Sequence, residues 1–280
     1  MATRKPSPRK NSKLSKTRTS EARRILRKPA APGKTVLYLY GITQKTKAFA
    51  PRKLALPSVD GSSQVIALPC GELLAWASSV SRAEFGDSLA ANMQNLEWLA
   101  NASVRHQAVL NELGKRGAVL PARFGLVFSS EDALARDVAS RRRELLQQFR
   151  RVREADEWGI KVFRLRSPSA ILGEANSGAD YMRRKAEAMR SESREKSPGI
   201  PEEIRNFADE LKKLVRDVAP GGSVSSGQAG LEWQLSVLLP RNRRPQFDQL
   251  IRKRARAWEG LRRIEVTGPW PPYSFVKAGA

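Results

Sequence analysis

The chain has 280 residues, with 51 Lys and Arg against 28 Asp and Glu, a single cysteine and a single histidine. With one cysteine and one histidine, the chain has no disulfide framework, no thiolate zinc site and no catalytic site that needs a Cys–His pair together with further Cys or His residues. At 40% hydrophobic and 28% charged residues, the chain is globular for most of its length, and its size favours two domains. No apolar run approaches the roughly 18 residues of a spanning helix, so we expect no membrane partner. The net charge of +23 permits acidic or polyanionic partners.

Residues 1–33 carry eleven Lys and Arg and one acid, Glu21, with too few apolar residues for a core. We predict a disordered basic arm, either a solvated tail or a docking segment for polyanions. Gly33-Lys34-Thr35 resembles the end of a phosphate-binding loop. The glycine required five positions earlier is replaced by Lys28 and a strand follows, so we reject nucleotide binding.

Residues 34–154 are predicted to form an N-terminal α+β domain that begins with strands. Val36–Ile42 is apolar throughout, which is typical of an interior strand. Residues 43–63 are predicted as a polar loop, and Gln64–Leu68 and Leu73–Val80 as two further strands. Cys70 lies in the turn between them without a nearby histidine, which favours a small neutral residue over a nucleophile.

A long helix is predicted from Asp87 or Ser88 to about Leu113. Its apolar residues recur every three or four positions, and His106 lies within this stripe. We therefore interpret His106 as a core residue, in preference to a ligand or base.

The stretch 118–128 reads as two short strands broken at Pro121. Arg123 within it has two open interpretations, a charge paired at the end of the sheet and a contact with a partner. Ser129 and Asp132 open a helix to about Val152. Its outer face carries a run of arginines that is usually solvated, with nucleic acid as the alternative partner: Arg141, Arg142, Arg143, Arg150 and Arg151.

Residues 155–280 are predicted to form a second α+β domain. Strands are expected at Trp158–Leu165, Leu231–Leu239 and Arg263–Thr267, with Val224 as a candidate short strand. Helices are expected over 180–218, interrupted at 197–201, and from Pro245 onward. The order β-α-β-α-β predicts a modified ferredoxin-like sandwich with its helices on one face.

The chain then turns a stiff corner of three prolines around Trp270. We interpret its aromatic residues Trp270, Tyr273 and Phe275 as a clasp that locks the last strand onto the domain. Structural packing is favoured over a peptide-binding site.

Six segments, taken in order, resemble the gas vesicle protein F/L family. They are Tyr38-Leu39-Tyr40-Gly41-Ile42, the helix with His106 ahead of Leu110, Leu120–Phe128, Glu157–Val162, Tyr181-Met182 and Gly268–Phe275. The match covers roughly residues 36–276 and leaves the basic arm outside the family pattern.

The resemblance implies a non-enzymatic accessory protein of gas vesicles without catalytic residues, cofactor or metal. It also implies two domains, a location at the gas vesicle in the cytoplasm, and binding to the main shell protein and other vesicle proteins. The positions that it marks as architectural or partner-binding are Arg123, Phe124, Gly125, Trp158, Gly159, Pro269, Trp270, Pro271, Pro272 and Tyr273.

We hypothesise that such a protein covers the apolar face of a shell subunit, by strand addition or in an apolar groove. The stretches Val119–Phe128 and 270–275 are the candidates for that contact. The alternative class is a nucleic-acid-binding module that uses the basic arm. The sequence lacks the aromatic run K/R-G-F/Y-x-F typical of RNA-binding sheets, with Trp158–Phe163 as its poor nearest match.

Overall fold

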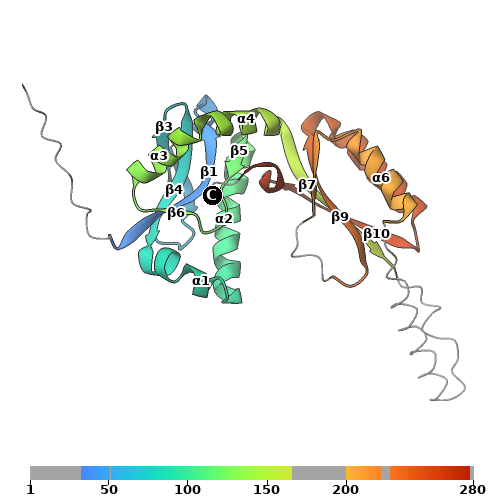
Figure 1. Ribbon diagram of the computed structural model, residues 1–280, viewed down its shortest axis with the longest axis horizontal. Helices are drawn as coiled ribbons and strands as arrows, with labels where there is room; N and C mark the ends of the chain where they lie inside the picture. Colours follow the sequence, from blue (N-terminus) through green and yellow to red (C-terminus); the bar gives the residue numbers. More distant parts are fainter. Residues whose placement is uncertain (1–32, 51, 166–199, 222–227, 278–280) are drawn as a thin grey trace, which may run out of the picture. The chain divides into compact units, whose positions relative to one another are not determined.

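A computed structural model describes residues 33–50, 52–165, 200–221 and 228–277 (Figure 1). All of its helices and strands belong to one compact unit, Lys34–Ala280. Its paired strands are antiparallel and form two sheets, so the fold is mixed α and β. The predictions for the arm, for residues 180–199 and for Val224 lie outside the described residues.

The first sheet has six strands: β1 (Thr35–Gln44), β2 (Lys53–Pro57), β3 (Gln64–Cys70), β4 (Leu73–Ser81), β5 (Val119–Pro121) and β6 (Val127–Phe128). Their order is β2-β3-β4-β1-β5, and β6 also pairs with β1. Strand β1 is central, which explains why its sequence is apolar on both faces. The predicted strands at 36–42, 64–68 and 73–80 are confirmed. The prediction of a loop throughout 43–63 is wrong, because Leu54 is buried and β2 pairs with β3.

A bulge at Tyr40 sets which side chains of β1 face which core. The register of β1 against β4 shifts between Leu39 and Gly41. Tyr38 and Tyr40 face a core shared with helix α2. Because of the bulge, Ile42 faces the opposite core, which Leu39 shares with α3 and α4. Gly41 is needed where β5 approaches, since a Cβ there would lie 2.8 Å from the carbonyl oxygen of Leu120.

The helices of this half are shorter and more numerous than predicted. They are the π-helical turn Ala83–Asp87, α1 (Leu89–Asn92), α2 (Leu96–Arg116), α3 (Glu131–Ser140) and α4 (Arg142–Val152), with a 3₁₀ turn at Lys47–Phe49. The predicted continuous helix from residue 87 is wrong because Asn95 is extended and caps α2. Its Oδ1 accepts hydrogen bonds of 3.1 Å from the backbone N–H groups of Glu97 and Trp98. The predicted single helix over 129–152 is interrupted at Arg141, and Ser130 provides its N-cap.

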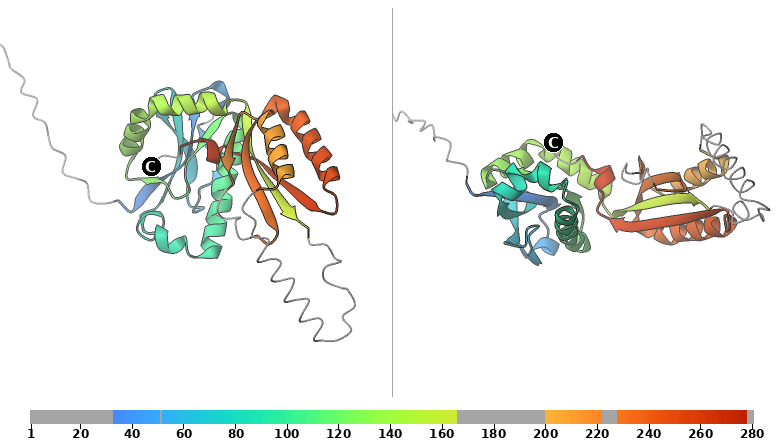
Figure 2. Two further views of the ribbon diagram at one scale, coloured as in Figure 1. Left: turned by 45° about the vertical axis from the view of Figure 1, so that its right-hand side comes forward. Right: turned by 90° about the horizontal axis from the view of Figure 1, so that it is seen from below.

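The second sheet has the order β10-β7-β9-β8. Its elements along the chain are β7 (Ala155–Arg164), α6 (Glu202–Lys212), β8 (Asp217–Pro220), β9 (Leu231–Pro240), a 3₁₀ turn (Arg241–Arg243), α7 (Arg244–Ala257), β10 (Arg262–Trp270) and a 3₁₀ turn (Tyr273–Phe275). Helices α6 and α7 share one core with the sheet (Figure 2, left). The predicted helix up to Val218 is wrong, because Val218 pairs with Val237 of β9 in a strand. This half thus contains one strand more than β-α-β-α-β.

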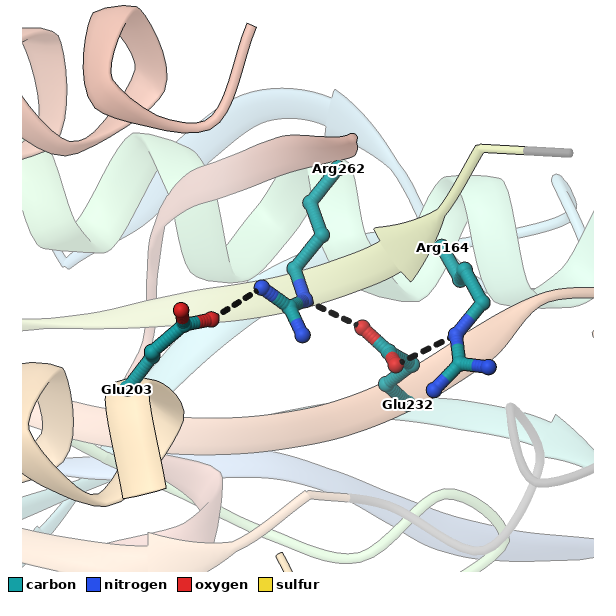
Figure 3. A network of polar contacts seen from close by, with 4 residues as sticks. All are labelled: Arg164, Glu203, Glu232 and Arg262. Atoms are coloured by element: carbon teal, nitrogen blue, oxygen red, sulfur yellow. Dashed lines mark hydrogen bonds and ion pairs between the residues drawn. The ribbon is translucent and has the colours of Figure 1, made fainter. Parts of the chain in front are cut away.

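An ion network with a nearly buried central pair ties the second sheet to α6 (Figure 3). The guanidinium of Arg262 on β10 donates from Nε to Glu232 at 2.6 Å and from Nη1 to Glu203 of α6 at 2.5 Å. Glu232 on β9 also accepts from Nε of Arg164 on β7 at 2.8 Å. The side chains of Arg262 and Glu232 are only 12% and 10% exposed, so the network replaces hydration that both charges lose on folding.

Candidate partner-binding site

The proline-rich corner begins where β10 meets β7. Trp270 pairs with Glu157 of β7 after a shift in register that starts at Thr267. Gly268 lies at φ +133°, and a Cβ there would come within 2.9 Å of the Trp158 ring. Only glycine fits this point, so the corner is fixed by local sterics as well as by its prolines.

Polar contacts clamp the chain after the corner. The buried carboxylate of Glu157 accepts hydrogen bonds from the Ser274 backbone N–H at 2.8 Å and from its hydroxyl at 2.6 Å. The Tyr273 hydroxyl donates to Oε1 of Gln107 on α2 at 3.2 Å. Phe275 and Val276 are buried in the core that also holds Leu238. Phe275 is therefore buried, as the predicted clasp requires, but it packs in the core that β1 shares with α3 and α4 and not only against its own half of the chain.

Trp270 and Tyr273 keep much of their surface in solvent, with exposed fractions of 41% and 37%. The Trp270 ring is oriented by a hydrogen bond of 3.3 Å from its Nε1 to the hydroxyl of Thr267. Pro271 and Pro272 beneath it are buried. The corner thus presents two aromatic side chains on a rigid backbone.

A cleft of about 460 Å³ lies beside this corner. One wall comes from the end of α2 and the start of β5 and mixes apolar, small and polar residues, with Leu110, Asn111, Gly114 and Val119. The other wall is formed by Pro269, Trp270, Pro271 and Pro272. An ion pair of 2.9 Å between Arg241 and Asp156 lines the same cleft, together with Lys115. Its dimensions and lining are those of a site for an apolar side chain or short segment.

Trp158 and Gly159 of β7 support the corner from below. Trp158 is 8% exposed and is stacked under the Arg244 guanidinium, 3.6 Å from the ring centroid. A Cβ on Gly159 would lie 2.8 Å from the hydroxyl of Thr267. Trp158 therefore shapes the site from the core, and Gly159 leaves room for Thr267.

The loop Arg123–Gly125 lies between β5 and β6 and does not line the cleft. Phe124 is partly buried, and its ring lies 5.7 Å from His106 and 6.2 Å from Trp98. Gly125 has φ +84° and donates its N–H to the Tyr38 hydroxyl at 3.2 Å. Arg123 alone exposes its side chain, which has no ion-pair partner among the residues described.

His106 belongs to the aromatic core that α2 shares with β1. It is 3% exposed, its Nδ1 lies 2.9 Å from the Tyr38 hydroxyl, and its ring stacks on Tyr40. Because the Tyr38 hydroxyl oxygen accepts a hydrogen bond from the Gly125 N–H, the hydroxyl proton of Tyr38 is available for donation to Nδ1 of His106. Burial lowers the pKa of His106 to about 4. The interpretation as a core residue is confirmed, although Nε2 has no hydrogen-bond partner in the described part of the chain.

Sequence reasoning missed the polar groups that hold the site together. Glu157 shares its strand with the charged residues Asp156, Lys161 and Arg164, so the sequence carries no signal that marks it as a buried, partnered carboxylate. Gln107 and the pair Arg241–Asp156 had no such signal, because their partners are distant in sequence.

The described residues contain no group of three or more His, Cys, Asp or Glu side chains that could hold a metal ion. The half-buried thiol of Cys70 lies 3.7 Å from the Leu68 carbonyl oxygen. None of the helices in the described part of the chain combines the length and apolarity needed to cross a membrane.

The fold places the chain in a known structural class. The crystal structure of the gas vesicle protein GvpF from Anabaena sp. PCC7120 superposes with a TM-score of 0.62 at 19% identity, over 87% of this chain and 98% of that chain. That of GvpF from Microcystis aeruginosa gives 0.59 at 19% identity, over 86% and 98%. The protein therefore has the fold of solved gas vesicle proteins.

Its sequence defines the family. Residues 36–277 match the family described as gas vesicle synthesis protein GvpL/GvpF, and the chain belongs to it. Gas vesicle protein L of Streptomyces sp. (strain CB03234) is 27% identical over 251 residues, which are 85% of this chain and 92% of that protein. Gas vesicle protein F of the same strain is 28% identical over 255 residues, 86% and 99% of the two chains.

Proposed function

We propose that this protein is a non-enzymatic accessory protein of gas vesicle assembly that binds the main shell protein and keeps its apolar surface covered before assembly. Family membership supports the vesicle context, and the cleft beside Trp270 supports the binding. A partly exposed tryptophan above a rigid proline wall is the type of anchor that dominates protein interfaces, because it buries a large area with little loss of conformational entropy. Other vesicle proteins are proposed as further partners, and the gas vesicle as the location.

We also infer that residues 155–280 are a ferredoxin-like domain and residues 34–154 a separate α+β domain. The strand order β10-β7-β9-β8 and the alternation of strands with α6 and α7 support the first inference. In this arrangement the cleft takes one wall from each domain, which is a common place for a binding site.

The alternative of nucleic-acid binding has less support from the described residues. Three arginines of the basic run at 141–151 are already paired, Arg141 with Asp137, Arg142 with Glu72 and Arg151 with Asp217. The basic arm would then have to supply the binding. Binding that falls steeply with salt and disappears without residues 1–33 would assign this activity to the arm alone.

The test is co-expression of the full chain with the main shell protein, followed by recovery of the shell protein with the tagged chain. Trp270→Ala should weaken binding at least tenfold or so, the order of magnitude for loss of an interface anchor. Leu261→Ala is the matched control, since Leu261 is an exposed apolar residue outside the cleft, at 64%. Equal recovery by wild type and a folded Trp270→Ala variant would overturn the assignment of this site.

A further inference from the structure

The exposed apolar side chains of the described residues are concentrated on one surface. Eight large hydrophobic side chains of the described residues are exposed, and five of them lie just before α2, in its first half or in the corner: Met93, Leu96, Val104, Trp270 and Tyr273. Leu96 and Val104, at 81% and 69%, are the two most exposed of the eight. A leucine this exposed on a regular helix gains no burial within its own chain.

The outward face of α2 continues from Leu96 mainly with apolar or small side chains. Leu96, Ala100, Val104, Ala108 and Asn111 are all exposed and lie three or four positions apart, so they form one stripe. We call this stripe the α2 face. Arg105 points away from it and donates to the carbonyl oxygen of Val59. On this side of α2 the charged side chains are confined to the two ends, Glu97 and Lys115, so its centre is suited to close contact with another protein.

The two ends of the α2 face complement each other in shape. Leu96 and Gly114 lie about five helical turns, or roughly 27 Å, apart on the same side of α2. Leu96 is the protruding apolar side chain at one end, whereas Gly114 lines the cleft at the other, next to Leu110 and Trp270. A second α2 helix that runs antiparallel brings each Leu96 over the cleft of the opposite copy.

The same arrangement is complementary in charge. A twofold axis beside residues 104–108 places Val104 against Ala108 of the second copy, and Glu97 against its Lys115. The Glu97 carboxylate is exposed and has no ion-pair partner among the residues described, and Lys115 is 75% exposed with only a neighbouring Glu112 at 3.4 Å. Every contact occurs twice, as an interface with twofold symmetry requires.

We propose that the protein forms a homodimer through antiparallel packing of its α2 faces, with Leu96 of each copy seated in the cleft beside Trp270 of the other. This inference rests on the surface of α2 and does not require the proposed function. If the dimer and the proposed function both hold, the second copy and the shell protein compete for the same cleft. The dimer then covers the cleft until the shell protein binds.

The test is the molar mass of the purified full chain, measured by sedimentation equilibrium at about 0.15 M salt, where the Debye length of about 8 Å limits repulsion between copies. The wild type should be a dimer. Leu96→Glu should raise the dimer dissociation constant by more than about tenfold, since the change occurs twice in the interface. Leu261→Glu, which places the same charge at an exposed leucine outside the α2 face, should leave the dissociation constant unchanged.

A charge exchange tests the register. Glu97→Lys and Lys115→Glu should each weaken the dimer, and the double variant should restore it. A monomeric wild type, or a dimer that Leu96→Glu leaves intact, would overturn the proposal.

Leu96→Glu also separates this inference from the proposed function, because Leu96 is remote from the cleft of its own copy. A monomeric Leu96→Glu variant that retains or improves shell-protein binding is the result expected if both hold. A dimeric wild type without affinity for the shell protein would refute the proposed function alone.

Discussion

The exposed area of a single side chain distinguishes the residues that can contact a partner from those that shape the fold. Trp270 and Tyr273 are more than a third exposed, whereas Trp158 is 8% exposed and covered by Arg244. Gly125 and Gly268 hold backbone angles that other residues adopt only with strain. Among the residues that the sequence marked as candidates, exposure therefore leaves those of the corner and Arg123 as possible contacts with a partner.

His106 makes stability depend on pH in a defined window. Because burial lowers its pKa from the ordinary value near 6.5 to about 4, the unfolded chain binds the proton more readily than the folded chain between those values. The stabilisation is complete above about pH 6.5 and is lost as the pH falls towards 4. We expect the free energy of unfolding to drop by about 2 kcal/mol between pH 7 and pH 5 from this group alone.

Urea unfolding at pH 7 and pH 5 measures this effect. His106→Phe keeps an aromatic ring in the same core and removes the titrating group, so its stability should change much less over the same interval. An unchanged pH dependence in that variant would show that other groups are responsible.

At the scale of elements, the ion network of Figure 3 holds β10, β9, β7 and α6 in one arrangement. Glu232→Ala removes the acceptor shared by Arg262 and Arg164 and leaves Arg262 nearly buried with Glu203 alone. Breaking a buried pair in this way costs about 3 kcal/mol, and chemical denaturation should report a loss of that order.

Glu265→Ala is the matched control for this prediction. Glu265 and Arg263 both lie on β10, as Arg262 does, but their pair is much more exposed. Exposed pairs contribute about 0 to 1 kcal/mol to stability. Equal losses for the two variants would contradict a special role for the network.

The elements also show what the sequence could and could not predict. Apolar runs predict β1, β3 and β4 because their side chains are buried, and helical spacing places His106 in the core. The break before α2 was missed because the apolar spacing continues through Leu89 and Met93, whereas the extended backbone of Asn95 interrupts the helix and its side chain caps the start of α2. Strand β8 was missed because four residues hold no pattern of their own, and their pairing with β9 decides the structure.

At the scale of the whole molecule, the site is assembled from segments distant in sequence. The sequence of the corner alone predicts a rigid backbone from its prolines and an aromatic surface from its Trp, Tyr and Phe residues. Its cleft could not be predicted, because one wall comes from α2 and β5 and the rim from the Arg241–Asp156 pair. The free face of α2 was likewise hidden, since the spacing of apolar residues does not reveal which of them remain exposed.

We propose that the protein serves vesicle assembly through the surface around Trp270. The most direct measurement is the number of gas vesicles, counted by electron microscopy, in cells that lack this protein and any paralogue and are complemented with defined variants. We predict that wild type restores vesicles, that Leu261→Ala does so equally, and that Trp270→Ala fails although it is folded and present at the same level. Normal vesicles in the uncomplemented cells, or full rescue by Trp270→Ala, would contradict the account.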